Sequence, residues 1–398
     1  MTRTAGLPPA PSSTRLPYLD NLRVTLTASV VFLHCALTYG SRYGSHPRLW
    51  YYTEPIRDPS GSALALVLLS TGSTVLGLFF LIAGFFVPAS HDRKGGRAFV
   101  RDRLLRLGLP IAVYVLLIRP FVTLGDYLVH YREDLSFGAY YVRSWSLGPM
   151  WFLETLLVFC LCYAALRSLR RGRAIAVMRP HAASGVAPHT TPHSARRSTP
   201  WVAGAVIGCC AGLAVLTYLW RIIVPIGSYW PVVDIPNPGC LPLYTALFIA
   251  GVLARRGQWH ERMPRAAGLW GLAAAGSCLA AALPVLPSLI NRPPQPESPL
   301  SLVMAFLETG LCVGSALAVV VLFRARFNRQ RGFGAFLAVN AFAVYLLHPV
   351  VVVGFGHVLS QWRAPAAAKC LLLWTLALPL CWGGSHLVRR VPAIARLL

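Results

Sequence analysis

Charged residues are scarce in this sequence. Only 13% of its 398 residues are Asp, Glu, Lys or Arg, whereas a soluble globular protein carries about a quarter. Acidic residues are the rarest of them, with 13 against 37 basic ones. Apolar residues make up 56% of the chain, and several apolar runs exceed the length of about 18 residues that a membrane-spanning helix needs. The composition excludes an ordinary soluble domain and predicts an all-α polytopic membrane protein.

Metal-ligand spacing, a targeting signal and a single basic patch are also missing. The ten cysteines lie in or beside apolar runs, without zinc-like spacing to histidine, which favours small buried residues over a metal site. The opening "MTRTAGLPPAPSSTRLP" lacks the apolar core of a signal peptide. The basic residues that give the net charge of +24 are spread over short clusters, which argues against nucleic-acid binding. Such clusters suit binding to anionic lipid headgroups or to an anionic cytosolic ligand.

Hydropathy predicts a bundle of about ten transmembrane helices, each bounded by charge, proline or glycine. The predicted spans lie near residues 21–40, 62–89, 107–125, 147–166, 201–220, 239–254, 267–290, 299–323, 333–358 and 369–388. Counted on alternate sides of these spans, 27 of the 37 basic residues fall on the side that holds both termini. The positive-inside rule therefore places the N- and C-termini in the cytosol.

The domain organisation follows from these spans. We expect a cytosolic segment at 1–20, one transmembrane domain at 21–390 and a cytosolic tail at 391–398. Residues 167–200 form the one long cytosolic insertion, and their richness in Pro, Ser, Thr and Ala predicts a disordered loop.

Ionisable residues interrupt the predicted spans. Arg23 and His34 are eleven residues, or about three helical turns, apart in "YLDNLRVTLTASVVFLHCAL" and so share a face. Glu154 and His348 fall at about the same depth as His34, and Arg119 and Glu308 lie within about one turn of it. Exposing a charged side chain to lipid at the centre of a span costs about 3 kcal/mol. The pattern therefore predicts a polar layer inside the bundle.

A structural role remains open for each of these residues. His34 can serve as an interhelical hydrogen-bond partner, and Arg119 can form an ion pair with a glutamate. His348 can bond to the carbonyl of Tyr345, which Pro349 leaves without a donor. Glu308 can be purely structural.

Arginines near the opposite face form a second candidate site. Arg103 and Arg106 are three residues apart, which places them on one helical face, with Arg97 and Arg101 close by. They are either snorkelling side chains at a helix end or a clamp for phosphate groups.

Four stretches resemble signatures of the membrane-bound acyltransferase 3 family, the O-acyltransferases of bacterial surface glycans. They are "YLDNLR" followed by His34, "RDRLLRLGLP" after "FFLIAGFFVP", "GPMWFLETLL" and "AVYLLHP". They occur in the family's order and at consistent topological positions over about residues 15–390. The first stretch looks closest to the branch that includes glucan succinyltransferases.

The resemblance implies transfer of an acyl group from cytosolic acyl-CoA, a donor substrate and not a resident cofactor, to a hydroxyl of a glycan or lipid-linked acceptor. By position, His34 corresponds to the family's essential histidine, Arg23 to its paired arginine, and Asp20 to the acidic residue that opens the first motif. Arg103 and Arg106 correspond to the donor-binding pair.

The chemistry of the residues suits such a transfer. His34 is the candidate general base, because histidine is the side chain whose unperturbed pKa lies near neutrality. Glu154 or His348 would orient His34 or relay its proton, and Arg119 would stabilise an oxyanion. Trp151 is either a substrate contact beside Glu154 or an aromatic anchor at the outer interface.

Two other functions fit the same residues. A proton-coupled transporter of a glycolipid or small metabolite would use the intramembrane His, Glu and Arg as a proton relay, and a scaffold would not need them. For an acyltransferase we expect the bacterial cytoplasmic membrane, with acyl-CoA, a glycan or lipid-linked acceptor and membrane lipids as partners, and no metal or nucleic acid. The acyl group, the acceptor, the oligomeric state and the role of loop 167–200 stay open.

Overall fold

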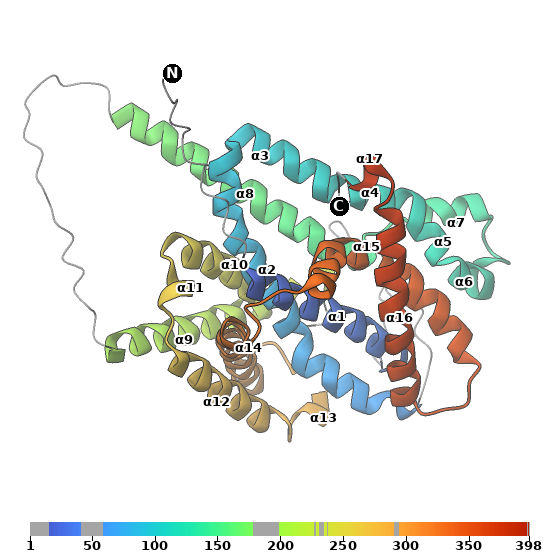
Figure 1. Cartoon of the computed structure of the whole chain (residues 1–398). Helices are drawn as coiled ribbons and strands as arrows, with labels where there is room; N and C mark the ends of the chain where they lie inside the picture. Colours follow the sequence, from blue (N-terminus) through green and yellow to red (C-terminus); the bar gives the residue numbers. More distant parts are fainter. Residues whose placement is uncertain are drawn as a thin grey trace, which may run out of the picture.

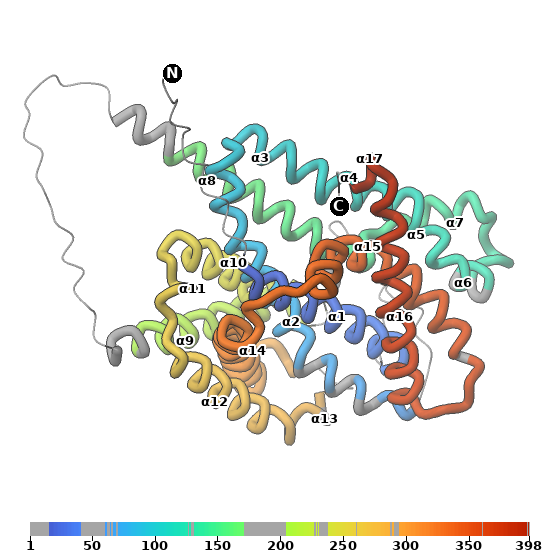
Figure 2. The backbone as a smooth tube through the Cα atoms, in the orientation of Figure 1, coloured from blue at the N-terminus to red at the C-terminus, as the bar shows by residue number. Residues whose placement is uncertain are grey.

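The computed structural model describes residues 16–40, 59–177, 199–226, 228–230, 235–236, 238–289, 294–395 and 397. These ranges are almost entirely helical (Figure 1), and Figure 2 traces their backbone in colour. Within them, nine helical segments are long and apolar enough to cross a membrane: Pro17–Gly40, Thr71–Lys94, Gly96–Val122, Phe137–Arg170, Gly204–Ile223, Pro238–Arg256, Pro299–Arg326, Gly332–Leu359 and Ala366–Val388. The predicted all-α polytopic fold is confirmed.

Most spans are single long helices. They are α1 (Pro17–Gly40), α2 (Ser62–Lys94), α8 (Trp151–Val177), α9 (Thr199–Ile223), α10 (Leu241–Arg256), α14 (Pro299–Arg326), α15 (Gly332–Ser360) and α16 (Ala366–Val388). Short helices connect or extend them: η2 (Pro59–Gly61), α6 (Leu124–Asp126), η5 (Tyr127–Tyr131), α7 (Phe137–Arg143), η6 (Gly148–Met150), η7 (Pro238–Cys240), α11 (Trp259–Arg262), α13 (Leu286–Leu289) and α17 (Pro392–Ala395). Two-residue strands β1 (Tyr229–Trp230) and β2 (Ile235–Pro236) pair antiparallel between α9 and α10.

The third span is irregular. It consists of α3 (Gly96–Arg103), the π-helical turn η3 (Leu104–Gly108), α4 (Leu109–Val113), the π-helical turn η4 (Tyr114–Ile118) and α5 (Arg119–Val122). Pro120 has no N–H for the carbonyl of Leu116, and the hydroxyl of Tyr141 donates to that carbonyl instead, at 2.5 Å. Proline thus breaks the regular pattern, and π turns of this kind are frequent at functional sites.

The tenth predicted span, 267–290, is present as a shorter helix. Helix α12 (Arg265–Ala282) ends before α13 and is rich in Ala and Gly. It packs against α14 at small residues: a Cβ added at Gly271 would lie 2.6 Å from the carbonyl oxygen of Gly314. Small residues let membrane helices approach this closely.

The predicted loop 167–200 differs from the structure at its start, because α8 continues as helix to Val177. Residues 178–198 lie outside the described part of the chain. The third span begins at Gly96 and not near residue 107, α12 ends at Ala282 and not near residue 290, and α1 already begins at Pro17, inside the predicted N-terminal segment 1–20. The remaining predicted boundaries agree with the helices within about five residues.

Helix α1 lies at the centre of the bundle, against α2, α14, α15 and α16 (Figure 1). One buried apolar cluster joins residues of α2, the third span, α8 and α10 with Tyr345 of α15. A second cluster joins α1, α15 and α16. Polar residues on the inner faces of α1 and α15 are therefore shielded from lipid.

Candidate active site

Two histidines from distant parts of the sequence meet inside the bundle. His34 of α1 and His348 of α15 have ring centroids 4.7 Å apart, with an angle of 49° between the ring planes. His348 is fully buried, whereas His34 keeps part of its surface accessible. The common depth predicted for these residues thus corresponds to direct proximity of the two imidazoles.

The backbone fixes the orientation of His348. Its Nδ1 lies 2.6 Å from the carbonyl oxygen of Tyr345, the oxygen that Pro349 leaves without a helical donor, as the sequence predicted. A carbonyl can only accept, so Nδ1 carries the proton in the neutral ring, and Nε2 keeps its lone pair. That Nε2, like Nδ1 of His34, is buried and has no hydrogen bond among the described residues.

Tyr345 connects this pair to the beginning of α8. Its hydroxyl donates to the carbonyl of Pro149, and its ring packs against Phe152 with centroids 5.9 Å apart. Glu154 lies in the first turn of α8 and is partly exposed. The contacts of Tyr345 thus place the start of the helix that carries Glu154 beside the helix that carries His348.

Trp151, the first residue of α8, is packed into the interior. It is 7% exposed, and its ring lies 6.0 Å from that of Tyr244 and 6.5 Å from that of Phe152. This burial does not fit an aromatic anchor at the outer interface. Its role as a substrate contact stays a prediction.

Arg119 is fully buried at the start of α5. Its Nε donates to the hydroxyl of Ser146 at 3.2 Å, in the segment that leads into α8. Gly148 in the same segment has a positive φ of 48°, and a Cβ there would lie 3.2 Å from Nη1 of Arg119. The turn before α8 therefore makes room for this guanidinium.

Arg23 holds the opposite end of α1 against α15. Its Nη2 donates to the carbonyl of Ala338 at 2.9 Å and lies 3.3 Å from Oδ1 of Asp20. Asp20 and Arg23 are three residues apart on one helix, so the acidic residue orients the guanidinium locally.

Arg103 and Arg106 have different direct partners. Arg103 donates to the hydroxyl of Ser90 at 3.1 Å and lies over the ring of Phe99 at 5.0 Å. Arg106 lies 3.1 Å from Asp102 and is half-exposed. A π-helical turn begins at Leu104, between the two arginines, and their shared face stays a prediction.

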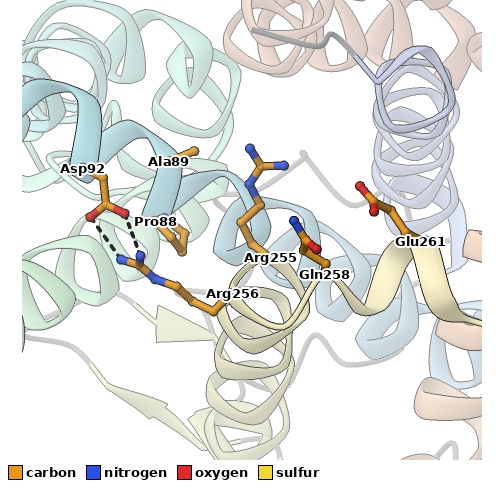
Figure 3. A pocket seen from close by; sticks show the side chains of 7 residues that line it. All are labelled: Pro88, Ala89, Asp92, Arg255, Arg256, Gln258 and Glu261. Carbon is orange, nitrogen blue, oxygen red and sulfur yellow. Dashed lines mark hydrogen bonds and ion pairs between the residues drawn. The ribbon is translucent and has the colours of Figure 1, made fainter. Parts of the chain in front are cut away.

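Asp92 joins three helices on the same face of the molecule, an arrangement that the sequence analysis missed. Its carboxylate lies 2.6 Å from Nη1 of Arg256 and 3.8 Å from Arg167, and Arg256 also donates to the hydroxyl of Tyr163 at 2.8 Å. Figure 3 shows Arg256 turned toward Asp92 while Arg255 points away from that pair, in a cavity of about 360 Å³. The C-terminal ends of α2 and α10 are thereby held together at α8.

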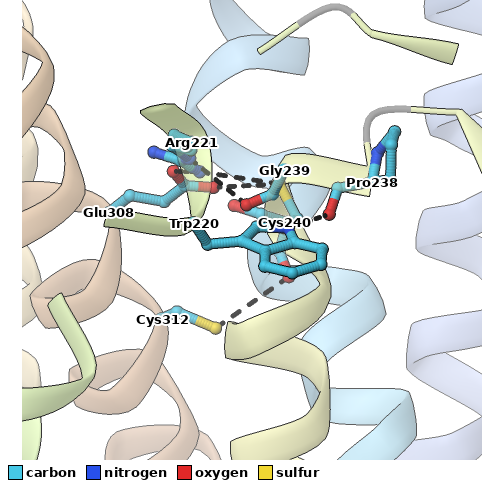
Figure 4. A network of polar contacts seen from close by, with 8 residues as sticks. Trp220, Arg221, Pro238, Gly239, Cys240, Glu308 and Cys312 are labelled. Atoms are coloured by element: carbon cyan, nitrogen blue, oxygen red, sulfur yellow. Dashed lines mark hydrogen bonds and ion pairs between the residues drawn. The ribbon is translucent and has the colours of Figure 1, made fainter. Parts of the chain in front are cut away.

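Glu308 has a partner that the sequence analysis did not identify. Its Oε2 lies 2.5 Å from Nη2 of Arg221, which is 1% exposed. The Sγ of Cys240 lies 3.7 Å from the same guanidinium and 3.6 Å from Oε1 of Glu308, and Arg221 Nε donates to the carbonyl of Gly239. This network joins α9, α14 and η7 (Figure 4). In the sequence, the only indication of this partner is the glutamate itself, because a charged residue inside a span needs a partner of opposite charge.

The comparisons with known proteins give one match. A family model described as an acyltransferase domain, that of the acyltransferase 3 family, matches residues 16–385. No curated protein and no solved structure matches the chain.

Proposed function

Because the chain belongs to the acyltransferase 3 family, we propose that this membrane acyltransferase moves an acyl group from cytosolic acyl-CoA to a hydroxyl group. The acceptor is a glycan of the cell envelope or a lipid-linked precursor, and the acyl group is acetyl, succinyl or a close relative. The membrane is the bacterial cytoplasmic membrane. The observation that carries the proposal is the pair formed by His34 and His348.

In the proposed reaction, His34 is the general base. Its Nε2 removes the proton of the acceptor hydroxyl while the hydroxyl oxygen attacks the carbonyl carbon of the thioester. The tetrahedral intermediate then collapses, the C–S bond breaks, and the imidazolium returns the proton to the leaving thiolate. No acyl-enzyme is formed.

His348 acts as a positioning residue in this scheme. Since Nδ1 of His348 donates to Tyr345, its Nε2 can only accept, and the nearest ring is that of His34, with centroids 4.7 Å apart. A bond from Nδ1–H of His34 to this nitrogen leaves the lone pair of His34 on Nε2, facing the acceptor. Such catalytic hydrogen bonds often tighten only when the substrate is bound.

The surrounding polar residues take supporting roles. Arg119 stabilises the oxyanion, Glu154 assists the histidine pair, and Trp151 forms part of the acceptor wall. Buried and prepositioned donors are effective for this purpose because they need no reorganisation.

The donor is bound by arginines at the cytosolic ends of the helices. Arg23 and Arg103 bond to neutral acceptors, the carbonyl of Ala338 and the hydroxyl of Ser90, which phosphate oxygens can replace with stronger bonds. Arg106 is half-exposed and available to the same phosphates, and Asp20 keeps Arg23 in place.

Acyl-CoA consumption by membranes that contain the wild-type protein, H34Q or H348Q tests the proposal. Acetyl-CoA and succinyl-CoA are supplied in parallel with extracted envelope glycans. We expect H34Q to lose at least about a hundredfold in rate, the ordinary contribution of a general base, and H348Q to lose less. H357Q, an equal change at an exposed histidine of α15, serves as the matched control, and near-wild-type transfer by H34Q contradicts the base assignment.

A proton-coupled transporter is the second candidate, since buried ionisable residues also serve proton relays. Donor binding separates the two functions. For the acyltransferase, R103Q raises the KM for acyl-CoA, and acyl-CoA protects Arg103 from chemical modification. A transporter shows neither effect.

A further inference from the structure

A cavity of about 440 Å³ opens between the first turns of α15 and the last turn of α16. It is separate from the histidine pair, and its lining residues are Ala335, Phe336, Val339, Asn340, His386, Arg389 and Arg390. Two of the lining side chains contact each other: the rings of Phe336 and His386 meet edge to face at 5.4 Å. The two helices are also joined by a hydrogen bond from Trp382 Nε1 of α16 to the carbonyl of Leu337 of α15, at 3.1 Å.

The cavity is cationic. Arg389 and Arg390 line it and no acidic residue does, and no ion pair of either guanidinium occurs in the described part of the chain. Arg23, Arg106 and Arg256, by contrast, each lie beside an aspartate. Two guanidinium groups without carboxylate partners next to a cavity suit a phosphate.

Asn340 adds a polar atom to the wall. It is 3% exposed, and its Nδ2 donates to the carbonyl of Phe336 at 2.8 Å. The amide oxygen is buried and has no hydrogen bond among the described residues. An unsatisfied buried acceptor is unfavourable, so this oxygen suits a ligand that carries a hydroxyl donor beside its phosphate.

The position of the cavity favours a lipid over a soluble ligand. Residues 335–340 lie within about 14 Å of the start of α15, and Arg389 directly follows the end of α16, so the cavity lies at the level of lipid headgroups. Apolar side chains beside it are exposed: Phe333 by 74%, Leu387 by 59% and Val339 by 44%. Acyl chains would cover these side chains, whereas a soluble phosphate would leave them uncovered.

Arginines at the end of a membrane helix also have a simpler explanation, since they snorkel to the interface and interact with the helix dipole. That explanation accounts for the charges of Arg389 and Arg390. It accounts neither for the cavity nor for the unsatisfied oxygen of Asn340.

We propose that the cavity between α15 and α16 binds an anionic phospholipid with a hydroxylated headgroup, its phosphate between Arg389 and Arg390 and its hydroxyl near Asn340. Basic pockets between membrane helices on the cytosolic side bind anionic headgroups in this way. The proposal does not depend on acyl transfer.

Native mass spectrometry of the purified full chain tests this, with phosphatidylglycerol and phosphatidylcholine of equal chain length titrated in parallel. We expect phosphatidylglycerol to bind in preference, and R389Q/R390Q to weaken that binding about thirtyfold, because each cation near an anionic headgroup contributes about a factor of five. R326Q/R329Q removes two exposed arginines at the end of α14 and should leave the binding unchanged.

Two further binding measurements test the headgroup hydroxyl and distinguish a lipid from a soluble phosphate. N340A should weaken phosphatidylglycerol while leaving phosphatidic acid, which has no headgroup hydroxyl, unaffected; this variant keeps both arginines in case the double variant does not fold. Glycerol 1-phosphate and acetyl-CoA should not displace the lipid. Equal binding of phosphatidylcholine, unchanged binding by R389Q/R390Q, or displacement by either soluble phosphate would overturn the proposal.

Discussion

The ion pair between Arg221 and Glu308 shows how a charged residue is accommodated among apolar helices. A lone charge there would cost about 3 kcal/mol. Arg221 reduces that cost because its guanidinium bonds to Glu308, to the thiol of Cys240 and to the carbonyl of Gly239. The three partners come from α14 and η7, so the pair fixes the chain segment before α10.

Removing one partner of this pair should destabilise the protein more than removing both. R221M leaves the partly buried Glu308 carboxylate without its cation and should lower the unfolding free energy by about 3 kcal/mol. The double variant R221M/E308L should recover most of that loss, because no uncompensated charge remains. Thermal unfolding of the purified variants measures both effects, with R326M at an exposed position as the control. Additive losses in the double variant would contradict a direct pair.

Local rules were enough to predict some contacts of the site. The bond from His348 to Tyr345 follows from Pro349 alone, because the residue without an N–H and the carbonyl it leaves open are four positions apart. The partner of Glu308 was not predictable in this way. Arg221 lies in the last turn of α9, and only the packing of α9 against α14 brings it to Glu308.

At the scale of elements, the turn before α8 links the third span to α15, the helix that carries His348. Gly148 adopts a positive φ, the neighbouring Pro149 accepts from Tyr345, and Ser146 accepts from Arg119. This short segment thus contacts Arg119 directly and reaches the neighbourhood of His348 through Tyr345.

Gly148→Ala should lower transfer more than it lowers stability. A left-handed conformation costs a non-glycine residue about 1–2 kcal/mol, and the added Cβ would lie 3.2 Å from Nη1 of Arg119, so the guanidinium must move. The rate of acyl transfer and the melting temperature are measured together. Gly138→Ala, at an exposed helical glycine with open space around it, should change neither the rate nor the melting temperature by much. A loss of rate in Gly148→Ala that is fully explained by the fraction of unfolded protein would speak against a role of this turn in the site.

Element boundaries were predictable where hydropathy changes sharply and not where composition is ambiguous. The stretch "RSLRRGRAIAV" lies in the predicted loop 167–200, whose prediction rests on Pro, Ser, Thr and Ala further along it. Arg, Leu and Ala are strong helix formers, however, and α8 continues through the stretch. The π-helical turns of the third span have no such signal, since they arise from proline together with the packing around it.

At the scale of the whole molecule, the number of crossings fixes the sides of the two termini. Nine crossings place them on opposite sides of the membrane and ten on the same side. The answer depends on α12, which has 18 residues and a length of about 27 Å, close to the hydrocarbon thickness of about 30 Å.

The packing of α12 favours ten crossings. Arg324 near the end of α14 donates to the carbonyl of Met263 just before α12, and contacts continue from Gly268 with Val321 to Cys278 with Gly310. The two helices are therefore antiparallel along most of the length of α12. Since α14 meets the requirements for a span, a helix packed along it in the reverse direction crosses too.

Reporter insertions on the two sides of α12 test this topology. A phosphatase domain that is active only outside the cytosol is inserted after Gln258, before α12, or after Gln295, before α14. We expect activity only for the insertion after Gln295, because ten crossings with both termini in the cytosol follow from the excess of basic residues on that side. If α12 lay along the membrane surface instead, both insertions would report the same side, and the two termini would lie on opposite sides of the membrane.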